Sequence, residues 1–258
     1  MSTWILLRGL TREARHWGRL PELLRDAVNA HHLLLIDLPG NGEFAGLRAP
    51  AQVAGMIEFV RDTAKRMGAT GPFNVFAMSL GGMVATQWAQ RYPHDIERLV
   101  LVNMSMRPFS RMQERLRPAA WPALLGVARH WRDAERVERV IHRLTCNNTD
   151  TFEADLRTWC EIRRSAPMTR GNALRQLRAA ARFTAAATRP QCLLLILSSR
   201  EDRLVDPVCS ANVATAWGAA HAEHASASHD LPHDDPVWTS AQVRAWLAPE
   251  PARADSAT

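Results

Sequence analysis

The chain has 258 residues, which is enough for one large domain, or for one domain that carries an insertion, around a sizeable buried core. Apolar residues make up 47% of the chain and charged residues 22%, the balance of an ordinary folded protein, so disordered, collagen-like and mucin-like classes are excluded. The formal net charge is +6, and the 32 basic residues are 31 arginines and one lysine. This excess of arginine over lysine indicates coding bias more than a nucleic-acid-binding surface.

Short apolar runs alternate with longer segments of helical period, which predicts a parallel sheet with crossover helices. Runs such as Leu33–Ile36 and Leu193–Leu197 are continuously apolar, as expected for strands that are covered on both faces. The predicted strands are Thr3–Arg8, His32–Asp37, Phe73–Ala77, Arg98–Asn103, Cys192–Leu197 and Ala220–Ala225. The predicted helices are Trp17–Asn29, Ala51–Met67, Leu80–Arg91, Val208–Trp217 and Trp238–Trp246.

This alternation stops near residue 105 and resumes near residue 190. The interval Met106–Arg189 contains no convincing strand but several helical stretches, one of them with Asp150 as a predicted N-cap and Glu153 as its reciprocal partner. We therefore predict an α/β core formed by residues 1–105 and 190–248, interrupted by a helical insertion of residues 106–189. Residues 249–258 are small, polar and rich in proline and alanine, and are expected to form a flexible tail.

A serine stands between the third predicted strand and the helix after it, within the run Met78–Gly82. On such a sharp turn the hydroxyl is exposed above the sheet, and the residues two positions to either side must be small because the two backbones nearly touch. Ala77 and Gly81 meet this demand. The short motif alone is as typical of a structural loop as of a nucleophile. The features that follow favour Ser79 as the nucleophile.

The catalytic acid is expected after the fifth predicted strand, since the order along the chain in this kind of fold is serine, acid, histidine. Asp202 lies there, at the carboxyl end of a strand, where open α/β sheets place their sites. Glu201 is expected to face solvent, and Asp206, which precedes a proline, is typical of an N-cap for the next helix. Asn103, at the end of the preceding predicted strand, is an amide and is set aside as an acid.

The general base is expected in the loop between the last predicted strand and the last helix. His229 lies in this loop and is the candidate. His221 and His224 alternate along the predicted strand and are expected to be packing or surface residues. His233 is the alternative base, because loop boundaries predicted from sequence are uncertain by a few residues.

Two backbone amides are expected to stabilise the oxyanion of the transition state. One is the amide of Leu80, at the start of a helix whose free N–H groups and dipole point toward the serine. The other is the amide of Leu10, after the first predicted strand, where Gly9 permits a sharp bend.

Several motifs that span nearly the whole chain together resemble the α/β-hydrolase superfamily: Leu6–Leu10, Asp37–Gly42, Ala77–Gly82, Asp202 and Ser228–Pro232. Within it, the short chain, the D-L-P-G-x-G loop and the helical insertion are similar to esterases of small carboxylic esters, including the pimeloyl-carrier-protein methyl ester esterases. The resemblance implies an α/β-hydrolase fold, a helical lid formed by the insertion, and neither cofactor nor metal.

The resemblance also implies roles for individual residues. Ser79, Asp202 and His229 would be nucleophile, acid and base, and the amides of Leu10 and Leu80 would form the oxyanion hole. The implied reaction is cleavage of a small-molecule carboxylic ester through an acyl-enzyme. A thioesterase, a lactonase, an acyltransferase or a hydrolase of carbon–carbon bonds would use the same triad, and some proteins of this fold bind ligands without catalysis.

The chain departs from the family's pattern at three residues. Arg8 stands where the family usually has histidine before the oxyanion glycine, and Ala77 and Ser228 each replace a glycine. The chain also opens with the strand that precedes the oxyanion turn in the family, so we expect the family's first two strands to be absent. We therefore predict a sheet of about six strands rather than eight, with His32–Asp37 at an exposed edge.

Positive charge is concentrated in the insertion. Residues 107–189 hold 17 arginines against 8 acidic residues, a net charge of +9, and the rest of the chain has a net charge of −3. Such a surface can steer an acidic acyl carrier protein or an anionic ester toward the entrance of the site. The alternative is a solvated helix face enriched in arginine by coding bias. Nucleic acid is not an expected partner, because no reader motif is present.

The cysteines and the apolar runs indicate the cellular compartment of the protein. The four cysteines form no C-x-x-C pair, and no histidine, cysteine or glutamate cluster has metal-ligand spacing, so we expect reduced thiols and no metal. The longest apolar runs fall far short of the ~20 residues that a membrane span needs, and the sequence lacks a signal-peptide pattern. We therefore expect a cytoplasmic protein.

Overall fold

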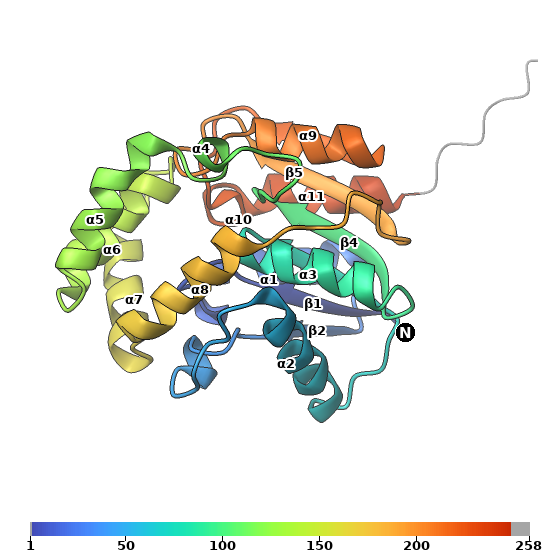
Figure 1. Cartoon of the computed structure of the whole chain (residues 1–258), viewed down its shortest axis with the longest axis horizontal. Helices are drawn as coiled ribbons and strands as arrows, with labels where there is room; N and C mark the ends of the chain where they lie inside the picture. The colour runs from blue at the N-terminus through green and yellow to red at the C-terminus, as the bar shows by residue number, and fades with distance from the viewer. Residues whose placement is uncertain (1, 249–258) are drawn as a thin grey trace, which may run out of the picture.

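The computed structural model describes residues 2–248, and its core is one sheet of six strands in the order β2-β1-β3-β4-β5-β6 (Figure 1). Every neighbouring pair of strands is parallel. The strands are β1 (Thr3–Leu7), β2 (His32–Leu35), β3 (Phe73–Met78), β4 (Ile96–Val102), β5 (Leu193–Ser199) and β6 (Ala220–His224). The number of strands and the edge position of β2 confirm the predicted sheet, and each strand begins and ends within about two residues of its predicted range.

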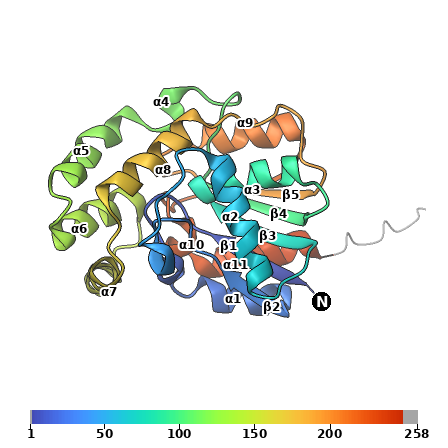
Figure 2. The same ribbon diagram turned by 60° about the horizontal axis from the view of Figure 1, so that its bottom comes forward.

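The side chains of β1 show why the central strands are continuously apolar. Trp4 and Leu6 pack into the core on one side of the sheet, Ile5 and Leu7 into the core on the other side, and all four are buried. The first side is covered by α1 (Leu20–Val28) and α11 (Pro236–Leu247), and the second by α2 (Val53–Arg66), α3 (Leu80–Arg91) and α9 (Val208–Trp217) (Figure 2).

The order of the strands reverses direction at β1. From β1 the chain passes to the edge strand β2, and then crosses back to β3 and continues to β4, β5 and β6. In an open parallel sheet this reversal leaves a crevice at the carboxyl ends of the central strands, and ligands bind there. The loops after β1 and β3 are therefore the expected position of a functional site.

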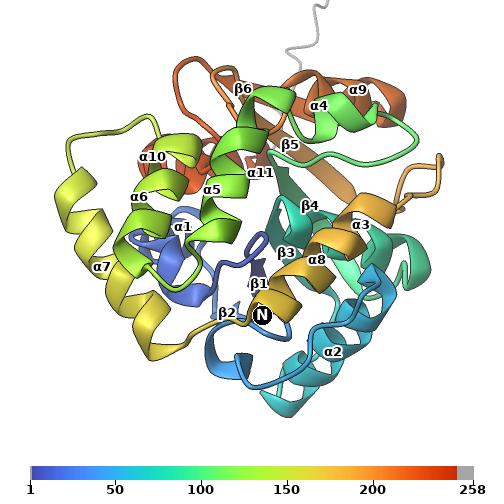
Figure 3. The same cartoon turned by 60° about the vertical axis from the view of Figure 1, so that its left-hand side comes forward.

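Between β4 and β5 the chain forms the helical insertion, residues 106–189, and within it the described residues contribute no strand to the sheet. Its ends meet at an isolated bridge between Arg107 and Thr184. Figures 1 and 3 show α5, α6 and α7 grouped beyond one end of the sheet, with α8 leading back toward α3. Its helices are α4 (Met112–Arg115), η3 (Pro118–Ala120), α5 (Trp121–Arg129), α6 (Ala134–Thr145), α7 (Phe152–Ser165) and α8 (Arg170–Arg182).

Two predicted helix starts are wrong. α7 begins at Phe152 with Thr151 in the N-cap position, so Asp150 is not the cap. The Thr151 hydroxyl donates to the Asp155 carboxylate at 2.7 Å, a bond that the capping-box pattern does not anticipate. The predicted helix from Trp17 is divided, because Gly18, at φ +54°, separates the short η1 (Ala14–Trp17) from α1.

All four cysteines are buried and unpaired. None of the helices within residues 2–248 combines the length and the apolar character that crossing a membrane requires. The predicted tail, residues 249–258, lies outside the described residues.

Candidate active site

Ser79 lies on the sharp turn between β3 and α3, at the carboxyl edge of the sheet. Its φ of +53° is in the left-handed region, which is unfavourable for a residue with a side chain and recurs at functional turns. The turn is held by the Ser79 amide, which donates to the Val102 carbonyl at the end of β4, at 3.0 Å. Ser79 remains partly exposed while its neighbours in β3 and α3 are buried.

Gly81 explains why this turn requires a small residue. A methyl group at this position would lie 2.4 Å from the Leu7 carbonyl oxygen and 2.7 Å from that of Arg8, closer than Cβ atoms come in proteins. Helix α3 can therefore approach β1 this closely only if residue 81 is glycine. Ala77, where the family pattern has its other glycine, is fully buried in β3, so a methyl group is accommodated there.

The turn after β1 lies directly against the serine. A methyl group at Gly9 would be 3.1 Å from the Cβ and 3.5 Å from the Oγ of Ser79. Leu10 follows this glycine, and Leu80 is the first residue of α3, where an amide has no acceptor within the helix. The two amides predicted for the oxyanion hole therefore belong to the two segments that flank Ser79.

His229 and Asp202 are in direct contact. Nδ1 of His229 lies 2.7 Å from Oδ2 of Asp202, and the two side chains are 5% and 1% exposed. The other carboxylate oxygen accepts the amides of Leu204 at 2.7 Å and Val205 at 2.9 Å. Because the loop holds the carboxylate in place, it favours the tautomer with the proton on Nδ1, in which Nε2 is free to accept a proton.

The hydrogen bonds of the described residues join His229 to Asp202 but not to the Ser79 hydroxyl. Ser79 follows β3 and His229 follows β6, so both stand at the carboxyl edge of the same parallel sheet. Hydrogen bonds of this kind are often long without substrate and tighten when it binds. The structure thus brings the predicted acid and base together and places the predicted nucleophile at their edge of the sheet.

The alternative acid and base candidates have other partners. Glu201 is exposed, as predicted. Asp206 accepts the amide of Val208 at 3.0 Å at the start of α9, one residue ahead of the cap position. His233, the alternative base, contacts the Asp155 carboxylate of α7 at 3.0 Å. The other two histidines of this region contact the Ser198 hydroxyl (His221) and the Asp235 carboxylate (His224).

Asn103 connects the ends of two strands to the loop that carries His229. It is buried after β4, with φ +42°. Its Nδ2 donates to the carbonyl oxygens of His229 at 2.8 Å and Ser228 at 3.2 Å, and also to the Ser199 hydroxyl at 2.9 Å. Its Oδ1 accepts the Ser199 amide at 2.9 Å. An amide cannot serve as the catalytic acid, but a polar residue at the end of a central strand is a sequence signal for a positioning role.

A buried ion pair joins the turn after β1 to the loop that carries His229. Arg8 directly precedes Gly9, and its guanidinium donates to both oxygens of Asp230, directly after His229, at 3.0 and 2.6 Å. The two side chains are 4% and 3% exposed. Burial raises the pKa of Asp230, but the charge and the hydrogen bonds of Arg8 more than offset this, so the pKa lies below its ordinary value. Arg8, a departure from the family pattern, therefore links the two halves of the site.

The helical insertion contacts the site on two sides. Thr11 lies in the turn after β1 with a φ of +61°, and its amide donates to the Gln176 side chain of α8 at 3.0 Å. Arg12 pairs with the buried Glu138 of α6 at 2.7 Å. Across the site, Arg117 donates to the backbone carbonyl of Asp202 at 2.7 Å. The insertion is thereby attached both to the turn after β1 and to the loop after β5 that carries Asp202.

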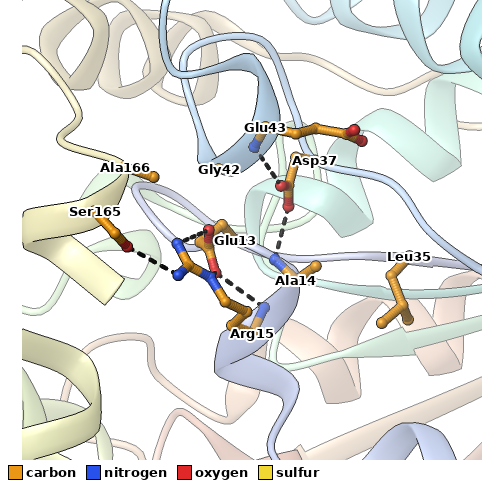
Figure 4. A pocket seen from close by; sticks show the side chains of 9 residues that line it. All are labelled: Glu13, Ala14, Arg15, Leu35, Asp37, Gly42, Glu43, Ser165 and Ala166. Carbon is orange, nitrogen blue, oxygen red and sulfur yellow. Dashed lines mark hydrogen bonds and ion pairs between the residues drawn. The ribbon is translucent and has the colours of Figure 1, made fainter. Parts of the chain in front are cut away.

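A cavity of about 470 Å³ lies away from Ser79, between the loop after β2, η1 and the end of α7 (Figure 4). Burial raises the pKa of Asp37 in its wall to about 6, although the carboxylate accepts the amides of Ala14 at 2.7 Å and Glu43 at 3.1 Å. Because these bonds hold its loop to η1, Asp37 has a structural role. The predicted catalytic residues do not line this cavity.

The fold and the turn at Ser79 define the class of protein as an α/β hydrolase. The chain belongs to the alpha/beta hydrolase family, whose family model matches residues 4–242.

The individual relatives differ widely from this chain in sequence. The chain is similar to the biotin biosynthesis bifunctional protein BioHC of Teredinibacter turnerae, with 31% identity over 104 residues, which cover 39% of this chain and 17% of that protein. It spans well under half the length of the curated relatives it matches. Among solved structures it is similar to the esterase RhEst1 from Rhodococcus sp., with a TM-score of 0.74, 19% identity, and coverage of 95% of this chain and 90% of that chain. A thermophilic esterase from Thermogutta terrifontis gives a TM-score of 0.71 at 18% identity, covering 96% of this chain and 89% of that chain.

Replacing Asn103 with aspartate is expected to lower kcat about 10- to 100-fold, because a carboxylate cannot donate to the His229 and Ser228 carbonyls and the loop shifts. A new negative charge beside His229 also favours the imidazolium, so the acid limb of the kcat/KM pH profile should move to higher pH. Asn212→Asp is the matched control. Asn212 likewise donates to a backbone carbonyl, that of Phe109, but lies on the exposed side of α9. Equal kcat values and equal pH profiles for both variants would contradict the positioning role.

Replacing Arg8 with methionine is expected to lower the free energy of unfolding by about 3–5 kcal/mol at pH 7, since it leaves the Asp230 carboxylate buried and unpaired. In the wild type the pKa of Asp230 is depressed, so its contribution is present above the unfolded-state pKa and is lost as the pH falls through the folded-state value. In the variant, the charges of His233 and Arg12 still oppose the effect of burial, but without Arg8 burial dominates and raises that pKa, so the destabilisation should shrink as the pH falls from 7 toward 4.

Urea unfolding across this pH range measures the difference. Arg200→Met is the control, because the ion pair between Arg200 and Glu223 is largely exposed and its loss should change the free energy of unfolding by less than about 1 kcal/mol. A destabilisation by Arg8→Met that stays constant with pH would show that lost packing, and not the unpaired carboxylate, is responsible.

Proposed function

We propose that this protein is a serine hydrolase that cleaves carboxylic esters, with Ser79 as nucleophile, His229 as general base and Asp202 as the acid that orients it. The observation that carries the proposal is the 2.7 Å contact between His229 and Asp202, at the same edge of the sheet as the strained turn at Ser79. Family membership supports a hydrolase, and the esterases among the structural neighbours agree with an ester substrate.

In the proposed reaction, Nε2 of His229 accepts the Ser79 proton as Oγ attacks the ester carbonyl carbon. The amides of Leu10 and Leu80 stabilise the oxyanion of the tetrahedral intermediate. When the intermediate collapses, His229 gives this proton to the departing alcohol, and the acyl group stays on Ser79. His229 then deprotonates a water molecule, which attacks the acyl-enzyme; the carboxylic acid leaves and the Ser79 hydroxyl is restored.

We also propose that the helical insertion acts as the lid of this site and favours an acidic acyl substrate, either an anionic ester or an acyl group on an acidic carrier protein. On α8, Arg170, Leu174, Leu177 and Arg178 follow the i, i+4, i+7, i+8 spacing of one helix face and all are exposed. Leu125 of α5 is 71% exposed. Apolar side chains among arginines suit a partner that presents negative charge beside an apolar group.

Ser79→Ala is expected to lower the turnover of p-nitrophenyl esters by about 10³-fold or more, because the variant keeps the fold but lacks the nucleophile. The measurement is release of p-nitrophenol over a series of acyl lengths, with circular dichroism to verify folding. Ser165→Ala, at the exposed end of α7, is the control and should stay within about twofold of the wild type.

Equal turnover by the wild type and Ser79→Ala would overturn the proposed nucleophile. If the wild type cleaves acyl thioesters or lactones but no ester, and still depends on Ser79, the triad stands and the substrate class changes. If the wild type cleaves none of these substrates, the protein is not the proposed hydrolase.

Salt should slow the reaction of an anionic ester but not of a neutral one. We expect kcat/KM for the p-nitrophenyl half-ester of adipic acid to fall about threefold or more between about 0.05 and 0.5 M NaCl, as the arginine field is screened, while p-nitrophenyl hexanoate is unaffected. Arg170→Gln with Arg178→Gln should reduce this salt dependence, and Arg25→Gln on α1 should not. If both esters respond equally to salt, the arginines of α8 are a solvated face without a role in substrate choice.

A further inference from the structure

The insertion meets the loop that carries His229 along a seam of buried and half-buried polar groups. The amide of Asp230 donates to the Thr145 carbonyl at the end of α6, at 2.7 Å. The carboxylate of Asp234, at the end of α10 (Leu231–Asp234), accepts amides from both sides of the seam, Asn147 at 3.0 Å and Ser228 at 2.7 Å. The end of α6 and the short helix α10 are therefore held in a defined relative position.

Three side chains with metal-binding atoms meet at this seam. His142 and Cys146 come from the end of α6 and His233 from α10, and one donor atom of each lies within 4.8 Å of the other two. His142 and Cys146 are 1% and 2% exposed. A spacing of four residues puts His142 and Cys146 on the same face of the helix, but His233 is distant in sequence, so no linear motif marks the cluster.

A carboxylate and an aromatic ring complete the surroundings of the cluster. Oδ2 of Asp155, on α7, lies 3.2 Å from Nε2 of His142 and 3.0 Å from Nε2 of His233. The Trp159 ring centroid is 5.1 and 5.2 Å from those of the two imidazoles. Metal sites use carboxylates in this way to orient imidazoles, and apolar shells to limit access of water. Hydrogen bonding to Asp155 holds the two histidines, and Cys146 packs beside them against Trp159 and Ile162, with its Sγ 3.7 Å from the Thr145 hydroxyl.

We propose that His142, Cys146 and His233 bind one zinc-class divalent cation at the junction of the insertion and the core. Two imidazoles and a thiolate are a donor set that zinc prefers, with Asp155 orienting the imidazoles and the fourth position left for water. Binding deprotonates the Cys146 thiol and releases its proton to solvent. Because zinc ligands lie about 2.0–2.3 Å from the metal, the donors draw together by about 1 Å, which is within the reach of side-chain rotation.

The cation would join the insertion to the segment that carries the proposed base. His142 and Cys146 belong to the insertion, whereas His233 lies four residues after His229. A ligand that binds only the folded chain stabilises it by mass action. Zinc at about 100 times its Kd is therefore expected to raise Tm by about 5–10 °C.

The test uses the full chain without an affinity tag, stripped with EDTA, transferred to chelator-free buffer and loaded with zinc or cobalt. The expected result is one metal ion retained per chain after desalting, the rise in Tm with zinc, and a thiolate-to-cobalt charge-transfer band in the near ultraviolet. Cys146→Ser should lose the band and bind cobalt about 100-fold more weakly or worse. Cys160→Ser is the matched control, since Cys160 is also a buried thiol of the insertion, on α7, but is outside the cluster.

The cobalt spectrum of the wild type decides the question even if Cys146→Ser does not fold, and His142→Gln gives a second variant for the same comparison. A wild type that retains no metal, or retains cobalt without the charge-transfer band, would overturn the site and leave a hydrogen-bonded cluster of His142, Asp155 and His233. Equal binding by Cys146→Ser and Cys160→Ser would place the metal elsewhere, for example at the adjacent exposed histidines His31 and His32.

Discussion

The close approach of helix α3 to strand β1 is the constraint on which the rest of this structure depends. With glycine at position 81 the first turn of α3 lies against the Leu7 and Arg8 carbonyls, where a methyl group would be 2.4 Å from an oxygen atom. This contact forces the chain through the left-handed conformation at Ser79 and sets the start of the helix beside the turn at Gly9. The proposed nucleophile and the two proposed oxyanion amides therefore share one backbone arrangement.

The helical insertion takes part in that arrangement and is not a separate cover. Glu138 of α6 is 2% exposed and pairs with Arg12 at 2.7 Å and with Arg163 at 3.1 Å, while Gln176 of α8 accepts the amide of Thr11. A buried carboxylate that lost these arginines would be left uncompensated, which is strongly unfavourable. Movement of α6 away from the core is thus coupled to the turn after β1, so substrate entry that displaces this helix would also disturb the amides proposed for the oxyanion hole.

Features set by residues that are close in the sequence could be predicted, whereas contacts between residues far apart in the sequence could not. Short apolar runs alternate with helical segments, so local pattern located all six strands to within about two residues, whereas Ser79 was predicted only from its motif together with the acid and the histidine further along the chain. The pairing of Arg8 with Asp230 joins residues 222 positions apart, and no local pattern contains it. The Asp150 cap failed for the opposite reason, because a local rule was overridden by the bond between Thr151 and Asp155.

Asn103, at the end of β4, makes hydrogen bonds that an acid at this position could not make. The amide at the end of β4 both donates, to the His229 carbonyl at 2.8 Å, and accepts, from the Ser199 amide at 2.9 Å. An ionised carboxylate could only accept, so an acid at this position would leave the His229 loop without its donor and place a second negative charge in the same region. With the proposed acid, Asp202, in the loop after β5, the end of β4 is free for an amide. Asn103, which cannot serve as an acid, is therefore the residue that holds the loop of the proposed base.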